Sequence, residues 1–150
     1  MIVKYISTRL QYKKMQPAIN ALPRDILEAR KRAYQYWLDK LIIEHFKVGA
    51  SSRLNYKPNK PEYDAWKVKK FGVATPLVLY GVLMREASKG IIRKLKTGIK
   101  ILWSNAPVYG KYQVEAGRDW QKRDALDLRR IRVVFKRELT KLRRLRLATV

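Results

Sequence analysis

The residues whose types could do chemistry are few, and the single histidine comes first among them. His45 is the only histidine in 150 residues, its one acidic neighbour is Glu44, and the chain has no cysteine. A zinc site or a histidine base needs further ligands or a partner that positions the ring, and the sequence places none nearby. We therefore interpret His45 as a residue of a helix C-terminus or of the core.

The hydroxyl and carboxylate side chains do not form a catalytic pattern either. No serine lies in a G-x-S-x-G elbow, and the seven glycines are too scattered for a loop that cradles phosphate. Two carboxylate pairs are close in sequence, Glu62 with Asp64 and Asp124 with Asp127. Charge at a helix start and surface pairing explain both better than acid–base catalysis. The sequence predicts a protein that is not an enzyme and has no catalytic residue, metal or cofactor.

Charge is the strongest feature of the composition, with 35 basic residues against 12 acidic ones and a net charge of +23. Such an excess has to be matched by an anionic partner or a larger assembly. It is densest in residues 121–150, which hold eleven basic and three acidic residues. These side chains either contact nucleic acid or another partner, or form a solvated face or intersubunit pairs. The candidate contact residues are Arg129, Arg130, Arg132, Lys136, Arg137, Arg143, Arg144 and Arg146.

The elements that must position these side chains follow from hydrophobic spacing. From Pro23 to Lys47 apolar residues recur at intervals of three and four, which predicts one face of a long helix. Pro23 suits the first helical position, and Gly49 can end the helix in a left-handed conformation. The expected apolar face consists of Ile26, Leu27, Ala33, Tyr34, Trp37, Leu38, Leu41, Ile42 and Phe46.

A second long helix is predicted from Asp124 to Leu147, where an apolar stripe again has helical spacing. This stripe can dock on the core or on a neighbouring subunit. Its members are Leu128, Ile131, Phe135, Leu139, Leu142 and Leu145.

Residues 90–105 favour a β-hairpin, because apolar and basic residues alternate on both sides of Thr97-Gly98. The alternative is a basic amphipathic helix on a membrane surface, which the central Gly98 and the β-branched residues disfavour. The longest uncharged apolar run, Pro76 to Met84, is far below the ~18 residues that span a bilayer. No membrane partner is therefore expected.

The segment 49–76 is rich in Gly, Pro and Ser, which predicts loops apart from a short helix around Glu62 to Lys70. At the N-terminus, Ile2–Ser7 fits either an edge strand or part of an extended arm over residues 1–22. We thus expect a single α+β domain over residues 1–150. In it, a long N-terminal helix and the basic C-terminal helix (121–150) pack on a small antiparallel β-sheet with a β-hairpin. The candidate interface loop consists of Tyr56, Pro58, Tyr63 and Trp66.

Several short stretches after the first helix form a pattern when taken together. They are His45-Phe46, Tyr56, Pro58, Tyr63, Lys67, Lys69-Lys70, Gly72, Pro76-Leu77-Val78, Gly81 with Leu83, and Ala106-Pro107-x-Tyr109. Over about residues 23–115 the chain resembles the neck and tail-completion proteins of tailed bacteriophages, which act in virion morphogenesis at the head–tail junction. It departs from them where Tyr80, rather than Thr or Ser, precedes Gly81, and in an arginine-rich tail after Gly117.

This resemblance implies a structural component of the virion neck or tail, such as a tail-completion or tail-terminator protein, made in the host cytoplasm. It implies a homo-oligomeric ring that joins head to tail and carries out no catalysis. The implied partners are other copies of the chain and neighbouring portal, neck or tail proteins, with packaged DNA as a further candidate. Charge alone supports an alternative, a basic RNA- or DNA-binding protein such as a ribosome-associated one.

Overall fold

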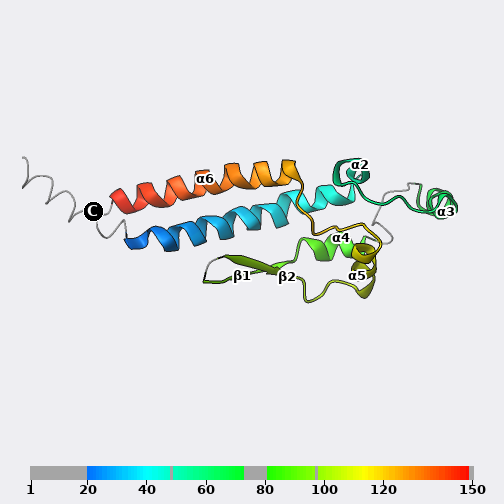
Figure 1. Cartoon of the computed structure of the whole chain (residues 1–150), viewed down its shortest axis with the longest axis horizontal. Helices are drawn as coiled ribbons and strands as arrows, with labels where there is room; N and C mark the ends of the chain where they lie inside the picture. The colour runs from blue at the N-terminus through cyan, green and yellow to red at the C-terminus, as the bar shows by residue number, and fades with distance from the viewer. Residues whose placement is uncertain (1–19, 48, 73–80, 97, 149–150) are drawn as a thin grey trace, which may run out of the picture.

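The computed structural model describes residues 20–47, 49–72, 81–96 and 98–148. An N-terminal helix, α-helical over residues 20–36, lies side by side and antiparallel with α6 (Ala125–Ala148), and the two set the long axis of the molecule (Figure 1). The strands β1 (Ile91–Lys94) and β2 (Ile99–Leu102) form an antiparallel hairpin beside them. The predicted α+β fold class is confirmed. The predicted N-terminal strand Ile2–Ser7 and the arm lie outside the described residues.

The N-terminal helix changes its winding in the core. After residue 36 it continues as a π turn, η1 (Trp37–Leu41), and a 3-10 turn, η2 (Ile42–Phe46). Its buried side chains here form pairs of neighbouring residues, and each pair follows the previous one after four residues. Because an α-helical turn takes 3.6 residues, a regular α-helix would rotate successive pairs away from the core. The wider π turn keeps these pairs on one side, toward the core. The pairs are Trp37 with Leu38, Leu41 with Ile42, and His45 with Phe46.

The predicted start of this helix is wrong, although its apolar face is confirmed and its end at Phe46 lies within one residue of the predicted Lys47. Residues 20–22 are already helical, so Pro23 is not the first helical residue. Gly49 is left-handed (φ 85°), but it precedes α2 (Ala50–Leu54), whereas the first helix ends at Phe46. Gly49, which suggested a loop, instead precedes the first residue of a new helix.

Three short helices were missed for this reason, α2, α4 (Val82–Ala87) and α5 (Val108–Glu115). α4 follows the left-handed Gly81, and α5 follows Pro107. Glycine and proline at the edge of a helix favour its boundary rather than exclude it. The predicted short helix around Glu62 to Lys70 is confirmed as α3 (Pro61–Phe71).

The predicted hairpin is confirmed, with Ile92 opposite Ile101 and the Leu95 N–H donating to the Gly98 carbonyl at 2.9 Å. Its base packs closely on the N-terminal helix. A Cβ atom on Gly90 would lie 2.8 Å from Ile101 and 2.9 Å from Leu38. No helix in the described parts of the chain is both long enough and apolar enough to cross a membrane.

α6 is the predicted C-terminal helix, but its buried face differs from the expected stripe. Leu128 and Leu145 are 47% and 65% exposed, whereas Asp127 and Glu138 are buried. Carboxylates occupy inward positions because the N-terminal helix meets them with donors and cations. Arg32 reaches Glu138 at 3.3 Å, and Arg146 of α6 reaches the buried Asp25 at 3.0 Å. These pairs fix the antiparallel register of the two helices.

Candidate functional site

The largest group of buried polar side chains surrounds Asp127, in the first turn of α6. Its Oδ2 accepts a hydrogen bond from His45 Nε2 at 2.7 Å and another from Trp37 Nε1 at 3.1 Å. All three residues are fully buried, and the Trp37 and His45 rings meet edge to face at 6.0 Å. The π and 3-10 turns of the N-terminal helix place both donors on the same side, against the start of α6.

His45 is held at both ring nitrogens. Its Nδ1 lies 2.9 Å from the carbonyl oxygen of Trp120, and its Nε2 faces the carboxylate of Asp127. Both ring nitrogens are thus engaged by oxygen atoms of other residues, and neither is open to a further ligand. The prediction that His45 is a core residue is confirmed.

Arg53 of α2 extends the cluster to the protein surface. It lies 3.2 Å from Asp124 and 3.7 Å from Asp127. Burial opposes ionisation of Asp127, but hydrogen bonds from His45 and Trp37, together with the charges of His45 and Arg53, outweigh it. The pKa of Asp127 is therefore held below its usual value.

The two carboxylates of this pair have different roles. Asp124 caps α6, since its Oδ1 accepts the Asp127 N–H at 2.7 Å, which confirms the prediction of helix-start charge. For Asp127, surface pairing is wrong, because its side chain is fully buried. A histidine–aspartate pair could orient a catalytic base, but both ring nitrogens of His45 are engaged and no substrate can reach them. The cluster joins the N-terminal helix, α2 and α6.

The surface of the molecule offers a second kind of site, an aromatic face on α3. Tyr63 and Trp66 stack with ring centroids 5.5 Å apart, and Phe71 meets Trp66 edge to face at 5.7 Å. Tyr63 and Trp66 are 41% and 42% exposed. The ammonium group of Lys70 lies 5.1 Å from the Trp66 ring. We call Tyr63, Trp66 and Phe71 the α3 aromatic face.

The segment that leads into α3 is fastened to the body by Arg118. Its guanidinium donates to the carbonyl oxygens of Lys57 at 2.8 Å and Pro58 at 3.1 Å. The Lys57 N–H donates to the Gly117 carbonyl at 3.4 Å. These bonds position α3, which lies at the end of the molecule farthest from the C-terminus (Figure 1).

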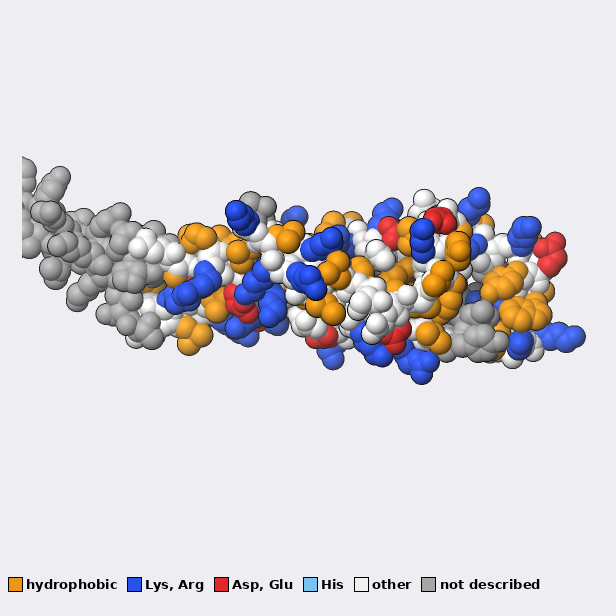
Figure 2. Space-filling view, turned by 90° about the horizontal axis from the view of Figure 1, so that it is seen from below, with side chains coloured by type: hydrophobic (Ala, Val, Ile, Leu, Met, Phe, Trp, Pro, Cys, Tyr) orange, Lys and Arg blue, Asp and Glu red, His pale blue; other side chains and the backbone are white. Residues whose placement is uncertain are grey.

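Of the predicted interface loop, Pro58 is exposed, and Tyr63 and Trp66 are exposed on a helix rather than in a loop. Tyr56 is instead 6% exposed in the core, and burial raises the pKa of its hydroxyl group. Sequence reasoning missed Val108 and Tyr112 of α5, which are 74% and 60% exposed. Figure 2 shows hydrophobic side chains toward this end of the molecule, interspersed with Lys and Arg.

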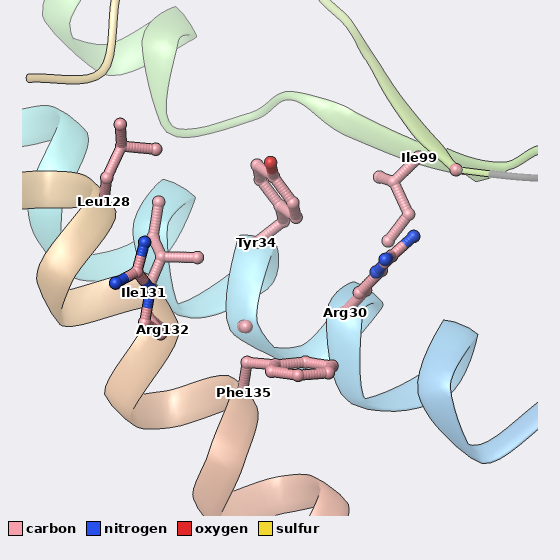
Figure 3. A pocket seen from close by; sticks show the side chains of 9 residues that line it. Arg30, Tyr34, Ile99, Leu128, Ile131, Arg132 and Phe135 are labelled. Atoms are coloured by element: carbon pink, nitrogen blue, oxygen red, sulfur yellow. The ribbon is translucent and has the colours of Figure 1, made fainter. Parts of the chain in front are cut away.

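A groove of about 520 Å³ lies between α6, the N-terminal helix and the tip of the hairpin (Figure 3). Leu128, Ile131 and Phe135 of α6 line one side, and Ile99 of the hairpin lies across from them. The remaining lining residues are Arg30, Ala33, Tyr34, Gly98 and Arg132. Among the described residues, the lining is mainly apolar, carries two guanidinium groups and includes no carboxylate.

The candidate basic residues of α6 fall into two groups. Arg130, Arg137 and Arg146 form ion pairs with Glu44, Glu138 and Asp25. The others are exposed, Arg132 at the rim of the groove, and in the part of the chain that the structure describes their side chains form no hydrogen bond or ion pair. We call this second group the α6 basic stripe; it consists of Arg129, Arg132, Lys136, Arg143 and Arg144.

The stripe follows helical geometry. Intervals of three, four and seven residues place Arg129, Arg132, Lys136 and Arg143 on one side of α6, opposite the buried Asp127 and Glu138. From Arg129 to Arg143 it extends over about 21 Å at 1.5 Å per residue.

No family model, curated protein or solved structure matches this chain. Across the described ranges, no three or more His, Asp or Glu side chains gather where they could hold a metal ion.

Proposed function

We propose that this chain is a structural component of a tailed-phage virion at the head–tail junction, a neck, tail-completion or tail-terminator protein. It assembles with other copies into a ring and mediates head–tail joining, with portal, neck or tail proteins as neighbours. The observation that carries the proposal is a pair of unlike apolar surfaces on one elongated protomer. The α3 aromatic face lies at one end, and the groove lies along the side of the long helices. Two different contact surfaces are what a subunit needs to meet a neighbour on each side.

The placement of polar groups agrees with this role. Asp127, His45 and Trp37 are fully buried and hold the N-terminal helix against α6. The resemblance to neck and tail-completion proteins covers about residues 23–115, which include the N-terminal helix and α3.

The test is electron microscopy of the purified, nuclease-treated protein. We expect closed rings of uniform diameter, and incorporation into particles when the chain is supplied to an assembly-defective phage of the matching type. Protein that stays monomeric at every salt concentration and never joins particles would overturn the proposal.

The α6 basic stripe favours a second function, binding of RNA or DNA. Five exposed cations on one helix can neutralise phosphates, and each neutralised phosphate releases a counterion. Affinity measured by fluorescence anisotropy would then fall log-linearly with salt. Self-association of a chain with net charge +23 has the opposite dependence, because salt screens the repulsion between copies. A salt series on rings and on nucleic-acid binding therefore separates the two functions.

A further inference from the structure

We propose that the α3 aromatic face of one copy docks in the groove of the next copy, so that each protomer both inserts a helix and receives one. The inference rests on the proposed function, because it names the contact by which the ring forms. The first support is chemical likeness. Tyr63 and Trp66 expose aromatic rings, and the groove exposes the apolar side chains of Leu128, Ile131 and Ile99.

The volume of the groove is large enough for an aromatic side chain of a second copy. Its volume of about 520 Å³ lies within the range of roughly 300–1,000 Å³ typical of pockets that enclose drug-sized groups. An aromatic side chain that leaves water buries roughly 150–250 Å² and contributes strongly to an interface. The Tyr34 ring and the Phe135 ring at the groove offer edge and face contacts to it (Figure 3).

The local charges are complementary although the whole molecule is strongly positive. The first turn of α3 carries Glu62 and Asp64, on either side of Tyr63, whereas its basic residues Lys69 and Lys70 lie in the last turn. The groove carries Arg30 and Arg132 and no carboxylate. Acidic residues are scarce in this chain, so the carboxylates of the first turn beside Tyr63, and their absence from the described lining of the groove, favour docking of this turn near Arg30 and Arg132 over an α3–α3 contact.

The arrangement of the two surfaces makes the contact intermolecular. α3 lies at the end of the molecule (Figure 1), and Arg118 holds the segment that leads into it. The groove is lined by residues of the N-terminal helix, α6 and the hairpin, away from that end. A helix held in this way cannot reach the groove of its own chain. A contact between two unlike surfaces is heterologous, and such contacts repeat from subunit to subunit until the rotation closes a ring.

Cysteine cross-linking tests the contact directly, because the natural chain has no cysteine. Trp66→Cys and Leu128→Cys each change a partly exposed side chain, so both variants are expected to fold. The two proteins are mixed and treated with a short bismaleimide. We expect a covalent dimer in the mixture and little in either protein alone. Leu145→Cys, at a 65% exposed position of α6 outside the groove, is the matched control and should not cross-link to Trp66→Cys.

Each other outcome has a defined meaning. Dimer formation by Trp66→Cys alone would indicate symmetric α3–α3 pairing and overturn the inference. Rings of the unaltered protein in micrographs without the mixed cross-link would also overturn it, while the proposed function would stand. Absence of both rings and cross-link would reject the two together.

A charge exchange gives an independent readout that needs no cross-linker. Glu62→Arg alone and Arg132→Glu alone should each weaken self-association about two- to fivefold, the range for an exposed ion pair. The combined variant should restore it, because the opposite charges meet again in exchanged positions. If the combined variant loses as much self-association as the two single changes together, these side chains do not meet.

Discussion

His45 Nε2 lies 2.7 Å from Asp127 Oδ2, and the two fully buried side chains are 82 positions apart in the sequence. The same carboxylate oxygen accepts the indole N–H of Trp37, and Arg53 approaches the other oxygen at 3.7 Å. One carboxylate thus connects three segments of the chain, and its loss leaves the buried Trp37 N–H and His45 ring nitrogen without their acceptor.

Replacement of Asp127 is the first prediction. Asp127→Ala should lower the free energy of unfolding by about 3–5 kcal/mol, as is usual when one partner of a buried ion pair is removed. Urea denaturation followed by tryptophan fluorescence measures the change. Glu115→Ala removes a carboxylate from an exposed pair with Lys111 and should cost no more than about 1 kcal/mol. Equal losses in the two variants would contradict the structural role of Asp127.

Acid should destabilise the protein through carboxylates whose pKa values are lowered by folding. A hydrogen bond from Lys141 lowers the pKa of Glu138, against the effect of burial, and Arg32 and Arg137 add to it. A hydrogen bond from Lys94 likewise lowers the pKa of Glu28. In an unfolded chain the pKa values of Asp and Glu are about 3.9 and 4.3. Stability from these groups is therefore fully present above about pH 5 and is lost as the pH falls through 4 toward the folded values.

The measurement is the urea midpoint between neutral pH and pH 3. Glu138→Gln should be less stable than the natural chain near neutral pH, and its midpoint should fall less on acidification. Identical pH dependence in the two proteins would show that Glu138 does not contribute.

Close packing at the base of the hairpin gives a third prediction. Gly90→Ala places a methyl group 2.8 Å from Ile101 and 2.9 Å from Leu38 and the Trp103 ring nitrogen, so the hairpin must shift. We expect a loss of about 1–3 kcal/mol in urea unfolding, the usual cost of overpacking. Gly98→Ala, in the same hairpin, meets nothing within 4 Å and should stay within about 0.5 kcal/mol. A harmless Gly90→Ala would mean that the hairpin does not pack on Leu38.

Replacement of two arginines of α6 should distinguish an arginine that stabilises the fold from one that is only exposed to solvent. Arg146→Gln removes both 3.0 Å hydrogen bonds to Asp25 and should cost about 1–2 kcal/mol of unfolding free energy, since Arg146 itself is partly exposed. Arg143→Gln, in the α6 basic stripe, should leave stability within about 0.5 kcal/mol. If RNA or DNA binds the stripe, only Arg143→Gln lowers its affinity at unchanged stability. Equal destabilisation by both changes would contradict the assignment.

Periodicity predicted the long helices and the hairpin because each forms from neighbouring residues. Periodicity did not predict the buried carboxylates of α6. Asp127 is buried because its hydrogen-bond partners lie on other elements, whereas helical spacing alone predicted that Leu128 would face the core. The short helices α2, α4 and α5 were missed because Gly and Pro at their starts also indicate loops. The spacing of Tyr63, Trp66 and Phe71 was visible, but their exposure depends on how the whole chain folds.

The long-range contacts of the Asp127 carboxylate also determine which part of the fold forms late. The contacts of Asp127 with Trp37 and His45 bridge 90 and 82 positions, so they form only after most of the chain has been brought together. During synthesis, His45 and Arg53 leave the ribosome well before Asp127 does, and both side chains stay hydrated until α6 arrives. The N-terminal helix therefore cannot complete its packing by itself. Docking of α6 is the step that converts a set of local helices into one cooperative structure.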